Sequence, residues 1–208
     1  IKNADGDVGG PRGWYSRGYL PHFDQPELIQ SITFRLADSL PQKILARIRA
    51  ELREIPAVRR KQEQRKKMEY WLDQGLGCCA LGHPEVAEKV QESLLHFDGQ
   101  RYRLLAWCVM PNHVHVLVEC LAKLPIIIQG WKSFTAHRVL PKNGELQLGI
   151  PDPNQFWMRE YWDRYTRDEN HLAAVINYIH ENPVKAGLCE KASDWPWSSA
   201  SKKATSAD

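Results

Sequence analysis

The chain has 208 residues and a formal net charge of +3 at pH 7, a length that suits one domain with elaborations better than two. Its five cysteines lack CxxC spacing and fit neither a disulfide framework nor a structural zinc site. No apolar run approaches the ~18 residues of a membrane span, and no secretory leader is evident. We therefore expect a soluble, cytoplasmic protein without a membrane partner.

Residues 1–27 are rich in glycine, basic and aromatic residues and predict a flexible arm without a core of its own. Two interpretations of this arm stay open, a clamp on nucleic acid and a loose terminus. Residues 28–36 are β-branched and roughly alternating, which predicts the first strand. We place the folded domain at residues 28–190 and a C-terminal tail at residues 191–208.

A helical insertion is predicted at residues 41–100. Pro41 suits the first turn of a helix, and the apolar stripe of this helix consists of Ile44, Leu45, Ile48, Leu52 and Ile55. After Pro56 a basic run reaches Lys67; such a run is usually a solvated helix face, and contact with phosphates is the alternative. Pro84 begins another helix.

Two apolar stretches around Pro111 and Asn112 predict a β-hairpin. His113 and His115 lie two residues apart on its return strand, so both imidazoles leave the same face of the strand while the alternating valines line the other. Two neutral nitrogen ligands on a rigid strand are half of a metal site. The alternative is that both histidines are ordinary half-buried polar residues of a strand, without a metal.

Residues 124–140 predict a helix and residues 158–167 a strand, and the acidic residues from Asp168 suit the first turn of a last helix. Strands broken by helices, with an antiparallel hairpin at the centre, indicate an α+β fold whose sheet is covered by helices on one face.

The last helix carries polar side chains at the border of its apolar stripe. At ~100° per residue, Tyr178 and Asn182 lie within ~40° of each other, whereas His180 points ~160° away from Tyr178. A tyrosine at the border of an apolar stripe usually packs its ring against the core and leaves its hydroxyl in contact with water. The alternative is that Tyr178 and Asn182 complete a site with the two histidines.

The chain resembles the REP-associated tyrosine transposases in residues 110–115 (MPNHVH), 177–188 (NYIHENPVKAGL) and 194–199 (DWPWSS). These proteins belong to the single-tyrosine HUH superfamily of IS200-like transposases, named for two histidines around a hydrophobic residue. Three motifs in the same order make the resemblance specific, and it runs from about Trp14 to Ser199.

The resemblance implies a ferredoxin-like or RRM-like antiparallel sheet, with the HUH motif on a central strand and the catalytic residue, Tyr178, on a late helix. It implies that His113 and His115 hold one Mg²⁺ or Mn²⁺ ion, with Asn182 as a third ligand. Pro183 is expected to end the helix at Asn182, in which case Glu181 or His180 could replace Asn182.

The activity that the resemblance implies is metal-dependent cleavage and strand transfer of single-stranded DNA beside REP-type palindromic hairpins, through a 5′-phosphotyrosine, by a monomer or homodimer. A non-catalytic hairpin-binding module for DNA or RNA is the alternative, and an RRM-like RNA binder is a third reading that leaves the histidine pair unexplained. Candidate DNA contacts are Trp14, Tyr15, Arg17, Lys132, Arg138, Arg159, Arg164, Arg167 and Lys185.

Overall fold

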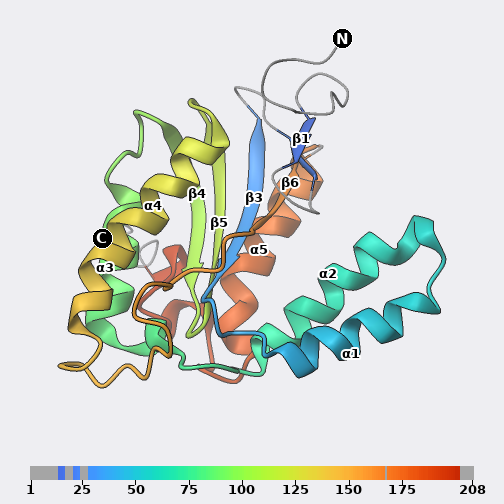
Figure 1. Ribbon diagram of the computed structural model, residues 1–208. Coiled ribbons are helices and arrows are strands. Elements are labelled where there is room, and N and C mark those ends of the chain that lie inside the picture. The colour runs from blue at the N-terminus through green and yellow to red at the C-terminus, as the bar shows by residue number, and fades with distance from the viewer. Residues whose placement is uncertain (1–13, 17–20, 24–27, 167, 202–208) are drawn as a thin grey trace, which may run out of the picture.

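The computed structural model describes residues 14–16, 21–23, 28–166 and 168–201 (Figure 1). Its centre is a four-stranded antiparallel sheet with the order β4-β5-β3-β6. In chain order its strands are β3 (Ile29–Arg35), β4 (Tyr102–Val109), β5 (His113–Cys120) and β6 (Trp162–Tyr165). A separate two-stranded antiparallel sheet joins β1 (Trp14–Ser16) to β2 (Pro21–Phe23), so two short pieces of the expected arm are paired strands.

The helices are α1 (Gln42–Arg53), α2 (Ala57–Asp73), α3 (Pro84–Leu95), α4 (Leu124–Val139) and α5 (Glu169–Lys185), with 3-10 turns at Ala80–Gly82, Leu140–Lys142 and Ala192–Asp194. The order from β3 to β6 is strand, helices, strand, strand, helix, strand, which is the β-α-β-β-α-β arrangement of ferredoxin-like folds. The predicted α+β class and antiparallel sheet are confirmed. The strand that carries the two histidines, β5, lies between β4 and β3.

Helices cover both faces of the sheet, so the expectation of helices on one face is wrong. The alternating valines of β5, Val114, Val116 and Val118, pack with α3 and α4 on one face. Leu117 of the same strand packs on the other face with Ile179 of α5. Figure 1 shows α4 in front of the sheet and α5 behind it. The sequence could not predict this arrangement. The apolar stripe of α5 shows that one side of the helix is buried, but it does not indicate which face of the sheet that side covers.

The region expected to be one helical insertion divides into two parts. Helices α1 and α2 form a hairpin with a small core of its own, made of Leu40, Ile44, Leu45, Ile48, Leu52, Met68 and Leu72, and this hairpin projects beside the β6 edge (Figure 1). Helix α3 instead packs on the sheet through Val86, Val90 and Leu94. Only α1 and α2 are therefore additions to the sheet and its covering helices.

The predicted strand at residues 158–167 is shorter than expected, because β6 begins only at Trp162. Before it, the backbone of Met158 donates to Arg35, and the side chain of Lys132 donates to the carbonyls of Met158 and Arg159. Residues 158–161 are thus tied to Arg35 of β3 and to α4 by isolated hydrogen bonds, and regular pairing with β3 begins at Trp162.

Helix α5 continues through Pro183 to Lys185, so the expected end at Asn182 is wrong. Asp168 caps its first turn by accepting from the backbone N–H of His171 at 2.8 Å. Proline removes one N–H and crowds the carbonyl one turn back, but it stands in the last turn, where few hydrogen bonds follow it. Asn182 therefore lies inside the helix.

Residues 192–201, assigned to a tail from the sequence, lie along the edge strand β4. The N–H of Val109 donates to Trp197 O at 2.8 Å, and Trp195 Nε1 donates to Val109 O at 2.9 Å. The segment thus satisfies backbone groups that an edge strand would leave open. In the part of the chain that the structure describes, no helix is long and apolar enough to cross a membrane.

Candidate catalytic and metal site

The two histidines of β5 meet on the face of the sheet that α5 covers. His113 lies opposite Arg35 and His115 opposite Thr33 of β3. Both side chains are buried, and their Nε2 atoms are 2.9 Å apart. The spacing of two residues along a strand brings the rings together, as the sequence predicted.

Hydrogen bonds at the far side of each ring set the tautomers. Asn112 Nδ2 donates to Leu72 O and Leu76 O, which leaves Asn112 Oδ1 to accept from His113 Nδ1 at 2.7 Å. His113 Nε2 therefore carries a lone pair. His115 Nε2 lies 2.9 Å from this nitrogen and therefore donates to its lone pair, so His115 Nδ1 accepts from Thr33 Oγ1 at 2.9 Å. Because the Thr33 hydroxyl can also accept, it can hold the other tautomer of His115, whose Nε2 is free to bind an ion.

Both imidazoles are neutral at physiological pH. Burial, and then the neighbouring His115, lower the pKa of His113 well below its usual value. Burial, and then the positive charge of Arg65, lower the pKa of His115 to about 3. A neutral imidazole is the form that coordinates a metal ion, so the site holds two nitrogen ligands ready at neutral pH.

Tyr178 of α5 lies against this pair. Its ring centroid is 5.5 Å from that of His115, and the two rings meet edge to face. Burial, and then the charge of Glu69, raise the pKa of the Tyr178 phenol, which is therefore protonated in the free protein. The ammonium of Lys185 lies over the same ring, 5.0 Å from its centroid.

Asn182 lies one turn beyond Tyr178 and is completely buried. Its Nδ2 donates to Tyr178 O at 3.2 Å, but its Oδ1 accepts no hydrogen bond from any residue that the structure describes. A buried amide oxygen without a donor costs ~1–3 kcal/mol and is unusual in a native protein. A bound cation would satisfy this oxygen, so the donor set of two imidazoles and one amide oxygen fits a divalent ion.

The alternatives to Asn182 have other positions. His180 Nε2 lies 2.8 Å from Ser199 Oγ, toward the C-terminal segment, as the helical wheel predicted. Glu181 is half-buried on the same turn. Within the residues that the structure describes, no three His, Cys, Asp or Glu side chains lie close enough together to form a metal site. A site here therefore depends on a ligand of another kind or on a side chain that moves.

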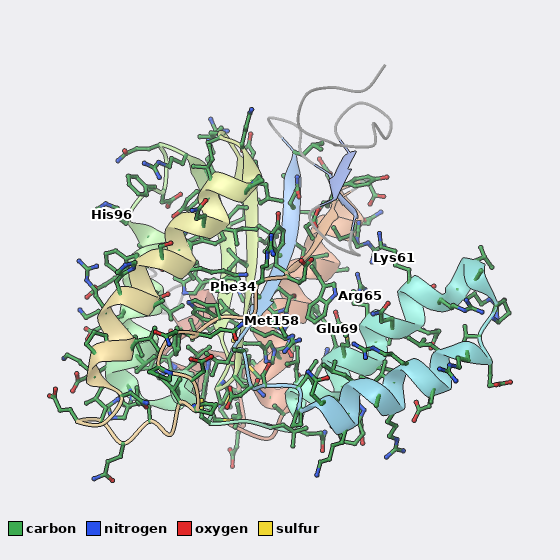
Figure 2. All side chains as sticks on the ribbon, in the orientation of Figure 1. Phe34, Lys61, Arg65, Glu69, His96 and Met158 are labelled. Carbon is green, nitrogen blue, oxygen red and sulfur yellow. The ribbon has the colours of Figure 1, made fainter. Side chains whose placement is uncertain are left out.

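Helix α2 contributes side chains that the sequence did not single out. Arg65, Glu69 and Asp73 follow one another at intervals of four residues, and Figure 2 shows Arg65 and Glu69 on the side of α2 that faces β6 and α5. Glu69 pairs with Arg65 at 3.3 Å. Burial, and then Glu69, raise the pKa of Asp73 to about 6. The four-residue spacing was visible in the sequence, but it is also typical of a solvated helix face.

A cleft of about 250 Å³ opens beside Tyr178 between β3, β6, α2 and α5. Its lining residues are Ser31, Thr33, Arg65, Glu69, Trp162, Asp163, Arg164, His171, Ala174, Val175 and Tyr178. Trp162 offers an aromatic surface, while Arg65 and Arg164 offer positive charge, the combination that suits unpaired nucleotides.

The candidate DNA contacts divide between the two faces. Arg164 lines the cleft and Lys185 lies over Tyr178. Lys132 and Arg159 instead line a separate cavity of about 480 Å³ beside α4, where burial lowers the pKa of Lys132 to about 8. Arg138, also on α4, stacks on Phe134 at 3.7 Å.

The remaining candidates are in the arm and before α5. The backbones of Trp14 and Tyr15 belong to β1, but their side chains, like Arg17 and Arg167, lie outside the described residues. All nine DNA contacts stay predictions.

Comparison with known proteins gives a family match for part of the chain. Residues 83–182 match the family described as "Transposase IS200 like". The match covers 100 of the 208 residues, just under half of the chain, so this part of the chain is similar to the IS200-like transposases. The matched residues run from just before α3 to Asn182 and thus include both histidines and Tyr178, whereas α1 and α2 lie outside them.

Two curated proteins resemble this chain over about half its length. A REP-associated tyrosine transposase of Escherichia coli K12 is 30% identical over 98 residues, which cover 47% of this chain and 53% of the relative. A Haemophilus influenzae Rd protein, provisionally given the same name, is 31% identical over 109 residues, which cover 47% of this chain and 58% of the relative. The match thus spans just over half the length of each relative.

A solved structure shares the fold. The structure of a REP-associated tyrosine transposase bound to a REP hairpin aligns with 90% of this chain and 86% of its own, with a TM-score of 0.52 and 17% sequence identity. At this identity the likeness concerns the fold, an α+β arrangement around an antiparallel sheet.

Proposed function

We propose that this chain is an IS200-like transposase, a metal-dependent endonuclease and strand transferase for single-stranded DNA, with Tyr178 as its nucleophile. The observation that carries the proposal is the meeting of three side chains. The Nε2 atoms of His113 and His115 are 2.9 Å apart, and the Tyr178 ring lies against His115. The match of residues 83–182 to the IS200-like family supports a transposase, and the mechanism is our inference from these residues.

His113, His115 and Asn182 would hold the ion, Mg²⁺ or Mn²⁺. Imidazole nitrogens suit Mn²⁺ and carbonyl oxygens suit both ions, whereas a thiolate site would favour zinc. When bound, the ion supplies positive charge that neutralises and orients the phosphate under attack. The hydrogen bonds from Asn112 and Thr33 fix the orientation of the two rings.

Tyr178 supplies the covalent step. Its Oη forms a bond to phosphorus, the bond between phosphorus and the 3′ oxygen breaks, and the phenolic proton ends on that 3′ oxygen. The products are a 5′-phosphotyrosine and a free 3′-hydroxyl, so no water or nucleotide is consumed. Because the phenol is protonated in the free protein, its proton leaves only as the bond to phosphorus forms.

The cleft beside Tyr178 suits a single strand. Tyr178 lines this cleft, and a DNA backbone that enters the cleft without a partner strand can approach its hydroxyl. Trp162 and Arg164 line the approach. The relative bound to a REP hairpin supports palindromic hairpin DNA as the substrate, and we infer that the chain acts beside such hairpins as a monomer or homodimer.

Cleavage of labelled hairpin oligonucleotides tests the proposal. Hairpins from repeats beside its own gene are incubated with the protein, with EDTA, Mg²⁺ or Mn²⁺, and separated on denaturing gels. We expect a metal-dependent cut that is lost in Tyr178→Phe and His113→Ala and kept in Tyr165→Phe, a tyrosine of β6 outside the site. Tight binding without cleavage in either metal would favour a non-catalytic hairpin-binding module instead.

A further inference from the structure

The C-terminal end of α2 is fastened to the histidine strand. Asn112, the residue before His113, donates to Leu72 O at 3.1 Å and to Leu76 O at 3.0 Å. These bonds hold the last turn of α2 beside the metal site. Asp73, the final residue of this helix, consequently lies with Oδ1 3.9 Å from His113 Nε2.

This approach is not an ion pair, because burial keeps His113 neutral. Asp73 also has no hydrogen-bond partner among the residues that the structure describes. The neighbouring carboxylate, Glu69, differs, since it pairs with Arg65 at 3.3 Å. The fold therefore brings to His113 Nε2 a carboxylate that has no hydrogen-bond partner among the described residues, although the charge of Lys185 also acts on it.

The spacing of these atoms suits a shared ion. Around a six-coordinate ion with ~2.1 Å bonds, neighbouring ligand atoms are ~3.0 Å apart and opposite ones ~4.2 Å apart. The two histidine nitrogens are separated by 2.9 Å, the spacing of neighbours. The 3.9 Å from His113 Nε2 to Asp73 Oδ1 lies between the two values. Among the described residues no three His, Cys, Asp or Glu side chains already form a metal site, so Asp73 has to move to complete this one.

An independent observation also indicates a cation. Asn182 Oδ1, from α5, is completely buried and accepts no hydrogen bond within the described part of the chain. Two imidazoles and an amide oxygen carry no net charge, and neutral ligands alone hold a hard divalent cation weakly. A carboxylate is the ligand that this donor set lacks.

We propose that Asp73 of α2 is a carboxylate ligand of the ion held by His113 and His115. The inference rests on the proposed function, because it assumes that an ion binds there. It gives the α1–α2 hairpin, which lies outside the residues that match the family, the role of completing the metal site. Two histidines and one carboxylate form a ligand set that favours Mn²⁺ over Mg²⁺.

Binding of Mn²⁺ alone, without DNA, tests the proposal. The free Mn²⁺ signal is followed by electron paramagnetic resonance during titration of the full chain and of Asp73→Asn, His113→Ala and the control Glu63→Gln. Glu63 is an α2 carboxylate that pairs with Lys66, so the control removes the same charge away from the site. Thermal unfolding in EDTA verifies that each variant is folded.

We expect Asp73→Asn to weaken Mn²⁺ binding at least tenfold while Glu63→Gln changes it less than twofold. The loss should persist in 1 M salt, because a long-range charge effect is screened over ~3 Å at that concentration. Unchanged affinity in Asp73→Asn, or a loss that disappears at high salt, would overturn the role of Asp73 alone. If the parent chain binds no Mn²⁺, or His113→Ala binds it equally well, both the ligand role and the proposed function fail.

Discussion

At the scale of single residues, the site is a set of buried polar groups with unusual protonation. Burial lowers the pKa of His115 to about 3 and that of His113 well below its usual range. In the unfolded chain a histidine titrates near ~6.5. As the pH falls below that value, these histidines bind protons in the unfolded state but stay neutral in the native state. The free energy of unfolding therefore decreases.

Acidification should therefore destabilise the metal-free protein. Each histidine contributes a loss of about 1.4 kcal/mol per pH unit below ~6.5, or about 2 kcal/mol by pH 5. Urea unfolding in EDTA at pH 5, 6 and 7 measures how the free energy of unfolding changes with pH. His115→Gln should reduce that change by about the contribution of one histidine. Asp73, whose raised pKa acts in the opposite sense, is present in both proteins and cancels. Parallel curves for the two proteins would contradict the prediction.

Asn182 should show a conflict between stability and function. Its Oδ1 lacks a donor among the described residues, and such a group costs ~1–3 kcal/mol when buried. We expect Asn182→Leu, which has a similar size, to raise the free energy of unfolding in EDTA by about 1 kcal/mol while weakening Mn²⁺ binding. The exposed Asn177, on the same helix, provides the control Asn177→Leu. A destabilised Asn182→Leu with normal Mn²⁺ affinity would mean that the amide is structural.

At the scale of elements, the site is assembled where β5, α5 and the end of α2 meet. Strand β5 supplies the histidines, α5 supplies Tyr178 and Asn182, and α2 supplies Asp73. Asn112 joins two of these elements, since its amide contacts one carbonyl in the last turn of α2, one carbonyl just after α2 and the ring of His113. It is 1% exposed, so no water replaces these contacts easily.

Asn112→Ala should consequently affect both stability and metal binding. Three hydrogen bonds at ~1 kcal/mol each predict a destabilisation of about 3 kcal/mol. Loss of the bond that orients His113 predicts a Mn²⁺ affinity about 10–100-fold weaker. This is the usual effect of removing a residue that hydrogen-bonds to a metal-binding histidine. The control is Asn143→Ala, which removes two bonds to Ile150 in a distant loop. It should lower stability and leave Mn²⁺ affinity as it was.

At the scale of the whole molecule, the sequence predicted local structure better than assembly. The strand at Ile29–Arg35, the hairpin and the position of α5 follow from periodicity, and the juxtaposition of the two imidazoles follows from the geometry of one strand. The face that α5 covers and the approach of Asp73 to His113 could not be predicted. Both depend on packing between segments far apart in the chain, which no local pattern encodes.

The same difference of scale explains the candidate DNA contacts. Lys132, Arg159 and Arg164 look alike in the sequence, but only Arg164 lines the cleft beside Tyr178. Lys132 donates to two backbone carbonyls beside α4, and this contact holds residues 158–159. A basic residue becomes a phosphate contact through its place in the fold, and sequence alone gives only its charge.

The most direct test of the central claim is to map the covalent bond to DNA. The protein is incubated with a single-stranded hairpin oligonucleotide and Mn²⁺, digested with protease and nuclease, and analysed by mass spectrometry. We predict a 5′-phosphonucleotide on the peptide that contains Tyr178, absent in EDTA and in Tyr178→Phe. DNA cleaved without any protein-linked product, or a nucleotide attached to another tyrosine, would contradict the account.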